Sequence, residues 1–172
     1  LGLVALAAGD SRSAQKQAKK AEKLLGRGLL PDSLAAQAAH LAGDKNAARR
    51  YFAQLSKHKD TAYYGLIGIM NLQFQNNDPE RSLVAAQKAL QIQPDSVAAL
   101  THIFWREVEE KHWHNAMNTL ERLIPQLVNL SEQKHLFQRR EIGLCYLLAL
   151  QVSEVRDKTK WLERALKIDQ SH

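Results

Sequence analysis

Apolar residues recur along most of the chain at the spacing of one helical face. Between residues 14 and 21, for example, alanines stand at positions i, i+4 and i+7, which is the buried stripe of an amphipathic helix. No sustained alternation of apolar and polar residues and no Asn-Gly hairpin indicates a strand. The pattern therefore predicts an all-helical chain. The expected helices cover residues 1–8, 11–26, 32–42, 45–57, 61–76, 79–92, 96–111, 114–129, 133–152 and 157–169.

Short turn signals recur along the chain at a fixed interval of 34 residues. They are Gly9-Asp10, Gly43-Asp44, Asn77-Asp78 and Lys111-His112. Five residues after the start of each turn stands a small side chain: Ala14, Ala48, Ser82 and Ala116. A small residue at this place allows two helices to cross closely. A 34-residue period with this packing pattern is typical of the tetratricopeptide repeat, which is a helix–turn–helix unit.

A fifth unit is out of phase with the other four. Residues 161–169 resemble the repeat ending at 87–94, and aligning Ala165 with Ala89 places the fifth turn near Ser153, eight residues late. The extra length is expected between Pro125 and Arg140. The sequence thus predicts a right-handed superhelix of about five tetratricopeptide-type hairpins, the first and last incomplete or irregular. This solenoid would form one domain over residues 1–172, with turns near 9, 43, 77, 111 and 153.

Three small residues are expected to serve packing. Gly65 and Gly68 lie inside a predicted helix, where glycine lowers helix stability, so we expect close packing against Ser82 and its neighbours. Cys145 is the sole cysteine and lies in an apolar run, which indicates a buried core residue. A single thiol can form neither an internal disulfide nor a paired-cysteine metal site.

The positive charge of the chain is concentrated at one end. The net charge is +6, and residues 1–60 hold 11 Lys and Arg against 5 Asp and Glu, which accounts for the whole excess. The residues concerned have helical spacing that places most of them on one face: Arg12, Lys16, Lys19, Lys20, Lys23 and Arg27. Such a face fits an anionic membrane surface or plain solvation. Nucleic acid is disfavoured because residues 10–30 contain no aromatic side chain.

No motif in the sequence indicates catalysis, a cofactor or a metal. Glycine-rich phosphate loops, a GxSxG element and a Cys/His arrangement are all missing. His112 and His114 lack a third ligand at useful spacing. Glu107 and Glu109 stand two apart on a helix and so point to different faces. We therefore expect a protein that is not an enzyme.

A binding groove is the favoured functional feature. In a tetratricopeptide superhelix, the first helix of each pair lines the concave face. The residues at those positions are Gln37, His40, Tyr64, Asn71, Phe74, Thr101, Trp105 and Arg140. Aromatic and arginine side chains often anchor bound peptides, although Trp105 also fits plain packing between repeats. We expect other proteins or peptides as partners.

The order of small and apolar residues over most of 1–124 resembles HemY-type proteins in their alphaproteobacterial form. The resemblance rests on the segments LGLVALAAGD (1–10), SLAAQAAHLAGD (33–44), ARRYF (48–52) and GLIG (65–68). It implies two transmembrane helices before this region, a soluble repeat domain on the cytoplasmic side of the bacterial inner membrane, and a link to late haem biosynthesis. The basic first repeat would then lie beside the bilayer.

These observations lead to one functional hypothesis and two alternatives. The hypothesis is a non-catalytic interaction scaffold of the inner membrane, linked to late haem or porphyrin biosynthesis. The first alternative is a tetratricopeptide adaptor in envelope assembly or secretion. The second is a haem or porphyrin carrier with His40 or His102 as an axial ligand.

Overall fold

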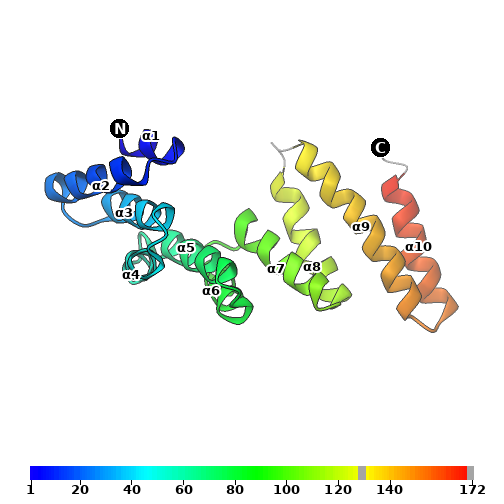
Figure 1. The fold of residues 1–172 in the computed structure, drawn as a ribbon. Helices are drawn as coiled ribbons and strands as arrows, with labels where there is room; N and C mark the ends of the chain where they lie inside the picture. Colours follow the sequence, from blue (N-terminus) through cyan, green and yellow to red (C-terminus); the bar gives the residue numbers. More distant parts are fainter. Residues whose placement is uncertain (128–130, 170–172) are drawn as a thin grey trace. The chain divides into compact units, whose positions relative to one another are not determined.

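The computed structural model describes residues 1–127 and 131–169, and within these ranges it contains helices and no strand (Figure 1). The predicted all-helical class is confirmed. The chain divides into two compact units, unit 1 (Leu1–Pro94) and unit 2 (Asp95–His172). None of the helices in the described ranges combines the length and the apolar character that a membrane span requires.

Unit 1 is built from three successive helical hairpins. Its helices are α1 (Gly2–Ala7), α2 (Ser11–Leu25), α3 (Leu29–Leu41), α4 (Lys45–Leu55), α5 (Ala62–Gln75) and α6 (Pro79–Ile92). Each helix packs against the next, and α1 also contacts α3 (Figure 1). The predicted helix 32–42 begins three residues earlier than expected, because Pro31 is tolerated in the first turn of a helix, where its missing N–H has no intrahelical partner.

The hairpins share one turn geometry. Gly9, Gly43 and Asn77 adopt left-handed backbone conformations with φ of 71°, 76° and 59°. In each turn the following aspartate donates its backbone N–H to the carbonyl five residues earlier, which closes the first helix of the pair. The side chain of the same aspartate then caps the second helix, as when Asp44 accepts from the N–H of Ala47 at 2.9 Å. The 34-residue period is therefore a repeated backbone structure.

Small residues pack the helices of unit 1 closely. Ala14, Ala48 and Ser82, the predicted crossing positions, are all fully buried. The Ser82 hydroxyl donates to the carbonyl oxygen of Met70 at 2.8 Å, so the one polar member of the set is satisfied. The predicted role of these positions in close helix crossing is confirmed for unit 1.

The glycines of α5 approach α4 most closely, whereas the prediction placed their close packing against Ser82 of α6. A Cβ atom on Gly65 would lie 2.6 Å from the backbone oxygen of Phe52, and one on Gly68 would overlap the Phe52 ring. A larger residue at Gly65 would require the α4 backbone to shift, whereas one at Gly68 would require the Phe52 ring to move. The sequence pattern identified the close approach, but not which of the two flanking helices makes it.

Unit 2 consists of two helical hairpins whose buried side chains are mostly larger than those of unit 1. Its elements are α7 (Val97–Glu109), α8 (Trp113–Leu123), the 3-10 turn η1 (Ile124–Leu127), α9 (Ser131–Gln151) and α10 (Val155–Asp169). The helix α7 packs on α8, α8 on α9, and α9 on α10. The α-helical part of the predicted helix 114–129 ends at Leu123, because Pro125 cannot donate the next helical hydrogen bond. Residues 128 and 129 of that prediction lie outside the described residues.

The fourth turn keeps the geometry of the first three but loses the cap. Lys111 has a φ of 60°, and the N–H of His112 donates to the carbonyl of Glu107 at 2.8 Å. The His112 side chain makes no capping hydrogen bond. One further period leads to Cys145, which is buried inside α9. The chain reverses between Gln151 and Val155 instead, around the expected Ser153.

Candidate partner-binding site

A pocket of about 540 Å³ opens between α3, α4 and α5 in unit 1. The structure brings five of the predicted groove residues together on its wall: Gln37, His40, Tyr64, Asn71 and Phe74. Other side chains complete the lining, among them Ser33, Phe52, Tyr63, Ile67 and Gln75. The helices α3 and α5 supply most of the wall, as expected for the first helices of successive pairs.

The lining of this pocket contains no Lys, Arg, Asp or Glu. Tyr64 and Phe74 remain 54% and 61% exposed, so both rings present apolar surface that a ligand could cover. The side chains of Gln37, Asn71 and Gln75 can each donate and accept hydrogen bonds. The pocket therefore offers apolar surface together with neutral groups that can pair with a peptide backbone.

Phe52 is the aromatic residue from α4 among the lining residues that sequence reasoning missed. It belongs to α4, the second helix of its pair, and only first-helix positions were expected in the groove. The Phe52 ring reaches the pocket because Gly68 has no side chain to hold it away from α5. A glycine opposite an aromatic residue in the preceding helix was the signal that could have revealed it.

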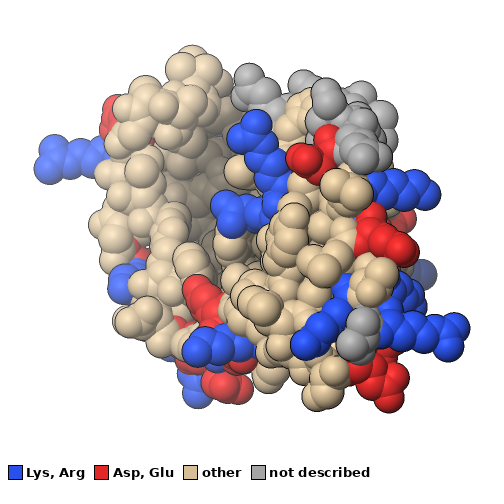
Figure 2. All heavy atoms as spheres, turned by 90° about the vertical axis from the view of Figure 1, so that its right-hand side faces the viewer, with Lys and Arg blue, Asp and Glu red and all other residues tan. Residues whose placement is uncertain are grey.

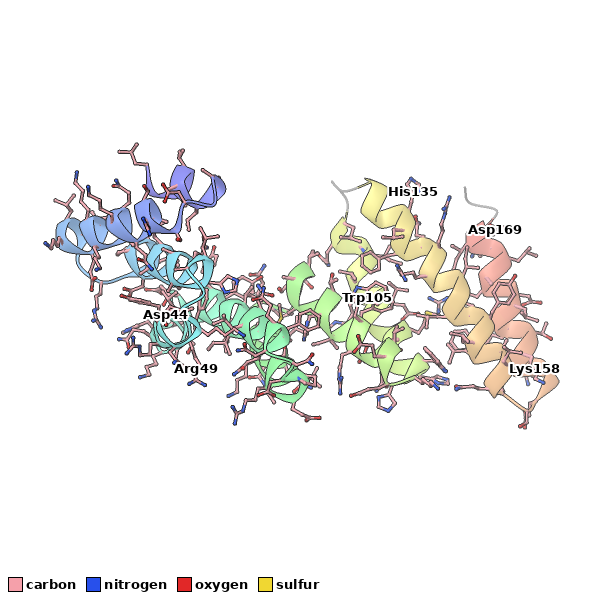
Figure 3. All side chains as sticks on the ribbon, viewed as in Figure 1. Asp44, Arg49, Trp105, His135, Lys158 and Asp169 are labelled. Atoms are coloured by element: carbon pink, nitrogen blue, oxygen red, sulfur yellow. The ribbon has the colours of Figure 1, made fainter. Side chains whose placement is uncertain are left out.

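A second, smaller cavity of about 240 Å³ lies in unit 2 beside Trp105 (Figure 3). Its wall includes two further groove residues, Trp105 and Arg140, with Trp113 and Leu147. The Arg140 guanidinium carbon lies 4.2 Å from the centre of the Trp105 ring, a cation–π contact. The pair comes from α7 and α9, so these two predicted groove residues are in direct contact. The last groove residue, Thr101, is half-buried and lines neither cavity.

The predicted basic residues form the outer face of α2. Arg12, Lys16, Lys19, Lys20 and Lys23 are exposed, and the opposite face buries Ala14 and Ala18. The sixth residue of the set does not continue this helical face, because Gly26 ends α2 with a φ of 73°. Arg27 instead lies in the turn that follows, with its Nε 3.5 Å from Glu22.

The histidines around the fourth turn have separate neighbours. His112 lies 3.2 Å from Glu110, whereas the ring of His114 packs edge-on against Trp161 at a centroid distance of 6.1 Å. Over residues 1–127 and 131–169, the structure holds no group of three or more His, Cys, Asp or Glu side chains that could bind a metal ion.

Burial explains the raised pKa values of two further side chains, Cys145 and Glu107. Desolvation raises the pKa of the Cys145 thiol to about 11, which makes the thiol unreactive. Burial also raises the pKa of Glu107, partly offset by a hydrogen bond from Thr119. Glu109 and Glu110 pair with Arg106 instead. The three glutamates thus form no shared acid–base site.

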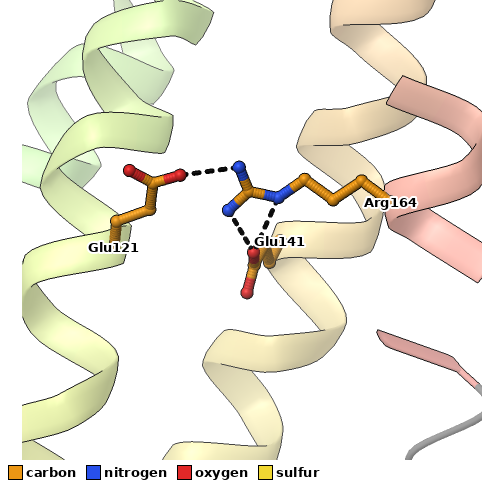
Figure 4. Close-up of polar contacts among 3 residues, drawn as sticks. All are labelled: Glu121, Glu141 and Arg164. Atoms are coloured by element: carbon orange, nitrogen blue, oxygen red, sulfur yellow. Dashed lines mark hydrogen bonds and ion pairs between the residues drawn. The ribbon is translucent and has the colours of Figure 1, made fainter. Parts of the chain in front are cut away.

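One arginine links the helices α8, α9 and α10 of unit 2 (Figure 4). Arg164 of α10 contacts Glu121 of α8 and Glu141 of α9, each at 2.6 Å. Burial disfavours the charged form of Arg164 and so lowers its pKa. The hydrogen bonds to both carboxylates outweigh this effect and raise the pKa of Arg164 above its ordinary value. On the face of the α9–α10 hairpin shown in Figure 2, positive and negative side chains are interspersed.

No known protein-family model matches the chain, and a search of curated proteins finds no match.

Proposed function

We propose that this protein is a non-catalytic interaction scaffold of the tetratricopeptide class. Four turns of one backbone geometry, spaced by 34 residues, support this class. In the proposal, the hairpins stack as a right-handed superhelix whose inner wall binds partner proteins. The resemblance to HemY-type proteins extends it to the bacterial inner membrane and to late haem or porphyrin biosynthesis.

The pocket between α3 and α5 is the observation that carries the proposal. It combines two exposed aromatic rings with a row of amide side chains and has no charged residue on its wall. Buried aromatic anchors contribute most of the affinity in peptide recognition, and hydrogen bonds to the backbone fix the register. We propose that it holds an uncharged, extended peptide segment with a bulky apolar side chain.

A display library of random peptides tests this binding directly. Peptides selected on the full chain would be measured for affinity against Tyr64→Ala and Phe74→Ala. Each change removes an exposed ring, so we expect binding to weaken by about 10- to 30-fold, which corresponds to loss of a strong aromatic anchor. Because the pocket is neutral, the affinity should change little with salt concentration.

Tyr146→Ala is the matched control, since Tyr146 is 53% exposed on α9 and does not line this pocket. Its affinity for the selected peptides should equal that of the unchanged protein. Equal loss in the Tyr64 and Tyr146 variants, or no selection of peptides above background, would reject the pocket as the binding site.

One observation favours the alternative of a haem or porphyrin carrier. His40 lies on the wall of the same pocket beside aromatic rings. Haem bound through this imidazole would give a shifted Soret band on titration with haemin, and His40→Ala would abolish the shift. An unshifted band with the unchanged protein dismisses this alternative.

A further inference from the structure

The turn between α2 and α3 exposes a cluster of leucines. Leu24 and Leu25 are 73% and 63% exposed at the end of α2, and Leu29 and Leu30 are 40% and 54% exposed at the start of α3. Only Gly26, Arg27 and Gly28 separate the two pairs. Four large apolar side chains over seven consecutive residues form an apolar patch that water solvates poorly.

Basic side chains surround this patch. Lys19, Lys20 and Lys23 lie on the exposed face of the same end of α2. Arg27, in the turn itself, also lines a hollow of about 510 Å³ together with Arg50 and Lys57 of the neighbouring α4 region. Asp32, the one acidic residue among those that line the hollow, is buried. Glu22 pairs with Arg27, so the positive charge at the mouth of the hollow comes mainly from Arg50 and Lys57.

We infer that this turn is a docking site for an anionic lipid surface. The leucines would enter the interfacial region of the bilayer, and Arg27, Arg50 and Lys57 would hold phosphate headgroups in the adjacent hollow. Exposed apolar residues flanked by Lys and Arg are what an interfacial membrane contact requires. The inference deepens the membrane part of the proposed function by naming the surface that would contact the bilayer.

Other occupants fit the combination less well. A nucleic acid would gain from the charges but not from four exposed leucines. A second copy of the chain would bring two positively charged ends together, which like-charge repulsion opposes. The exposed apolar residues of α1 lack the basic component of this site, because residues 1–9 carry no charged side chain.

Vesicle binding by the full chain tests the inference. Phosphatidylglycerol–phosphatidylcholine vesicles should retain the protein in sedimentation, whereas vesicles of pure phosphatidylcholine should not. Leu24→Ser with Leu30→Ser should weaken the partition about tenfold, and Arg50→Gln with Lys57→Gln should do the same and reduce its salt dependence.

The matched controls lie in unit 2. Leu150→Ser with Leu166→Ser removes leucines that are 80% and 56% exposed, and Lys158→Gln with Lys160→Gln removes two exposed charges. Both control proteins should bind vesicles as the unchanged protein does. Each control pair removes two leucines or two positive charges, as its test pair does, so the comparison isolates the position of the change.

A fluorescent probe reports insertion directly. Leu25→Cys can be labelled with an environment-sensitive dye, because Cys145 is fully buried and its raised pKa keeps it unreactive. The emission should increase and shift to the blue on anionic vesicles. An unchanged emission, or binding that ignores the leucine variants, would overturn the insertion.

Two further outcomes would overturn the inference in favour of another occupant. One is tighter binding to a DNA duplex than to the vesicles, and the other is a dimer in solution that the leucine variants abolish. The selected peptides provide a separate readout, since the pocket variants at Tyr64 and Phe74 leave this turn intact. If the unchanged protein binds the selected peptides but not the anionic vesicles, this inference alone is rejected.

Discussion

Units 1 and 2 use different side chains to bring helices together. The buried apolar residues of unit 1 are mostly alanines, and glycines let α5 approach the backbone of α4. The buried residues of unit 2 are mostly larger, such as Phe104 and Leu120, and Phe104 contacts Phe137 edge-on at a centroid distance of 5.7 Å. Unit 2 also adds the ion triad around Arg164.

This difference has a consequence for binding. Where a helix packs through small residues, its ring-bearing side chains are free to line an open space, as Phe52 does over Gly68. Where large side chains fill the same layer, less space remains, and the cavity beside Trp105 has less than half the volume of the pocket in unit 1. The small-residue repeats therefore hold the better candidate site.

The largest expected loss of stability comes from a substitution in the core of unit 2. Phe104→Ala removes a ring that is 1% exposed, and we expect a loss of about 3–5 kcal/mol from the transfer and cavity costs together. Hydrogen-exchange mass spectrometry should show the loss of protection concentrated in α7, α8 and α9. Uniform loss over both units would show that their stabilities are coupled and that the comparison between them fails.

The converse change overpacks unit 1. Gly65→Ala places a Cβ atom against the backbone of α4, which cannot move as a side chain could, so we expect a loss of about 1–3 kcal/mol despite the better helix propensity of alanine. Gly143→Ala in α9 is the matched control, because a Cβ there meets nothing within 4 Å. Chemical denaturation of the two variants should move the midpoints in opposite directions.

The ion triad should contribute less than either core. Arg164→Met leaves Glu141, whose side chain is 12% exposed, without its partner, and we expect a loss of about 1–2 kcal/mol. Glu121→Gln removes the more exposed of the two ion pairs and should cost no more than about 0.5 kcal/mol. Equal thermal shifts for the two variants would contradict the larger contribution expected from the buried Arg164–Glu141 pair.

The turns provide a finer comparison. Asp44→Ala removes a cap from unit 1 and should cost about 1 kcal/mol, whereas His112→Asn adds the missing cap to unit 2 and should stabilise it by about 0.5–1 kcal/mol. Thermal melts of both variants measure these changes. If the His112→Asn protein is no more stable than the unchanged protein, the first N–H groups of α8 already have other hydrogen-bond partners.

The smallest expected effect depends on pH. Because burial raises the pKa of Glu107, its charged form destabilises the folded state above that raised pKa, and the cost disappears below the ordinary value of 4.5. Glu107→Gln should therefore stabilise unit 2 by about 0.5 kcal/mol at neutral pH, a small value because the side chain is half exposed and screened by water. Denaturation midpoints at neutral and acidic pH check that the gain is lost in acid.

Much of the fold could be predicted because it depends on local residues. Helix type follows from apolar spacing, and the turns follow from Gly9, Gly43 and the capping aspartates that come after them. Helix ends were less certain where two signals compete, as at Pro31, which is tolerated in a first turn, and at Pro125, which stopped α8 before the expected position.

The candidate site was predicted only in part. The first-helix rule found Gln37, Tyr64 and Phe74, since it depends on position within a repeat. It could not find Phe52, whose entry to the pocket depends on which helix faces Gly68. The apolar patch at the α2–α3 turn was also missed, because a leucine at helical spacing does not reveal whether another element covers it.

The sequence by itself determined the helical class, the 34-residue turns and the residues that pack closely, because these follow from backbone preferences and spacing within one repeat. Only the tertiary structure decided which small residue meets which helix, which rings line open space and which leucines stay uncovered. Each of these properties depends on contacts with residues distant in the chain, so the exposure of a side chain is known only once those residues are placed.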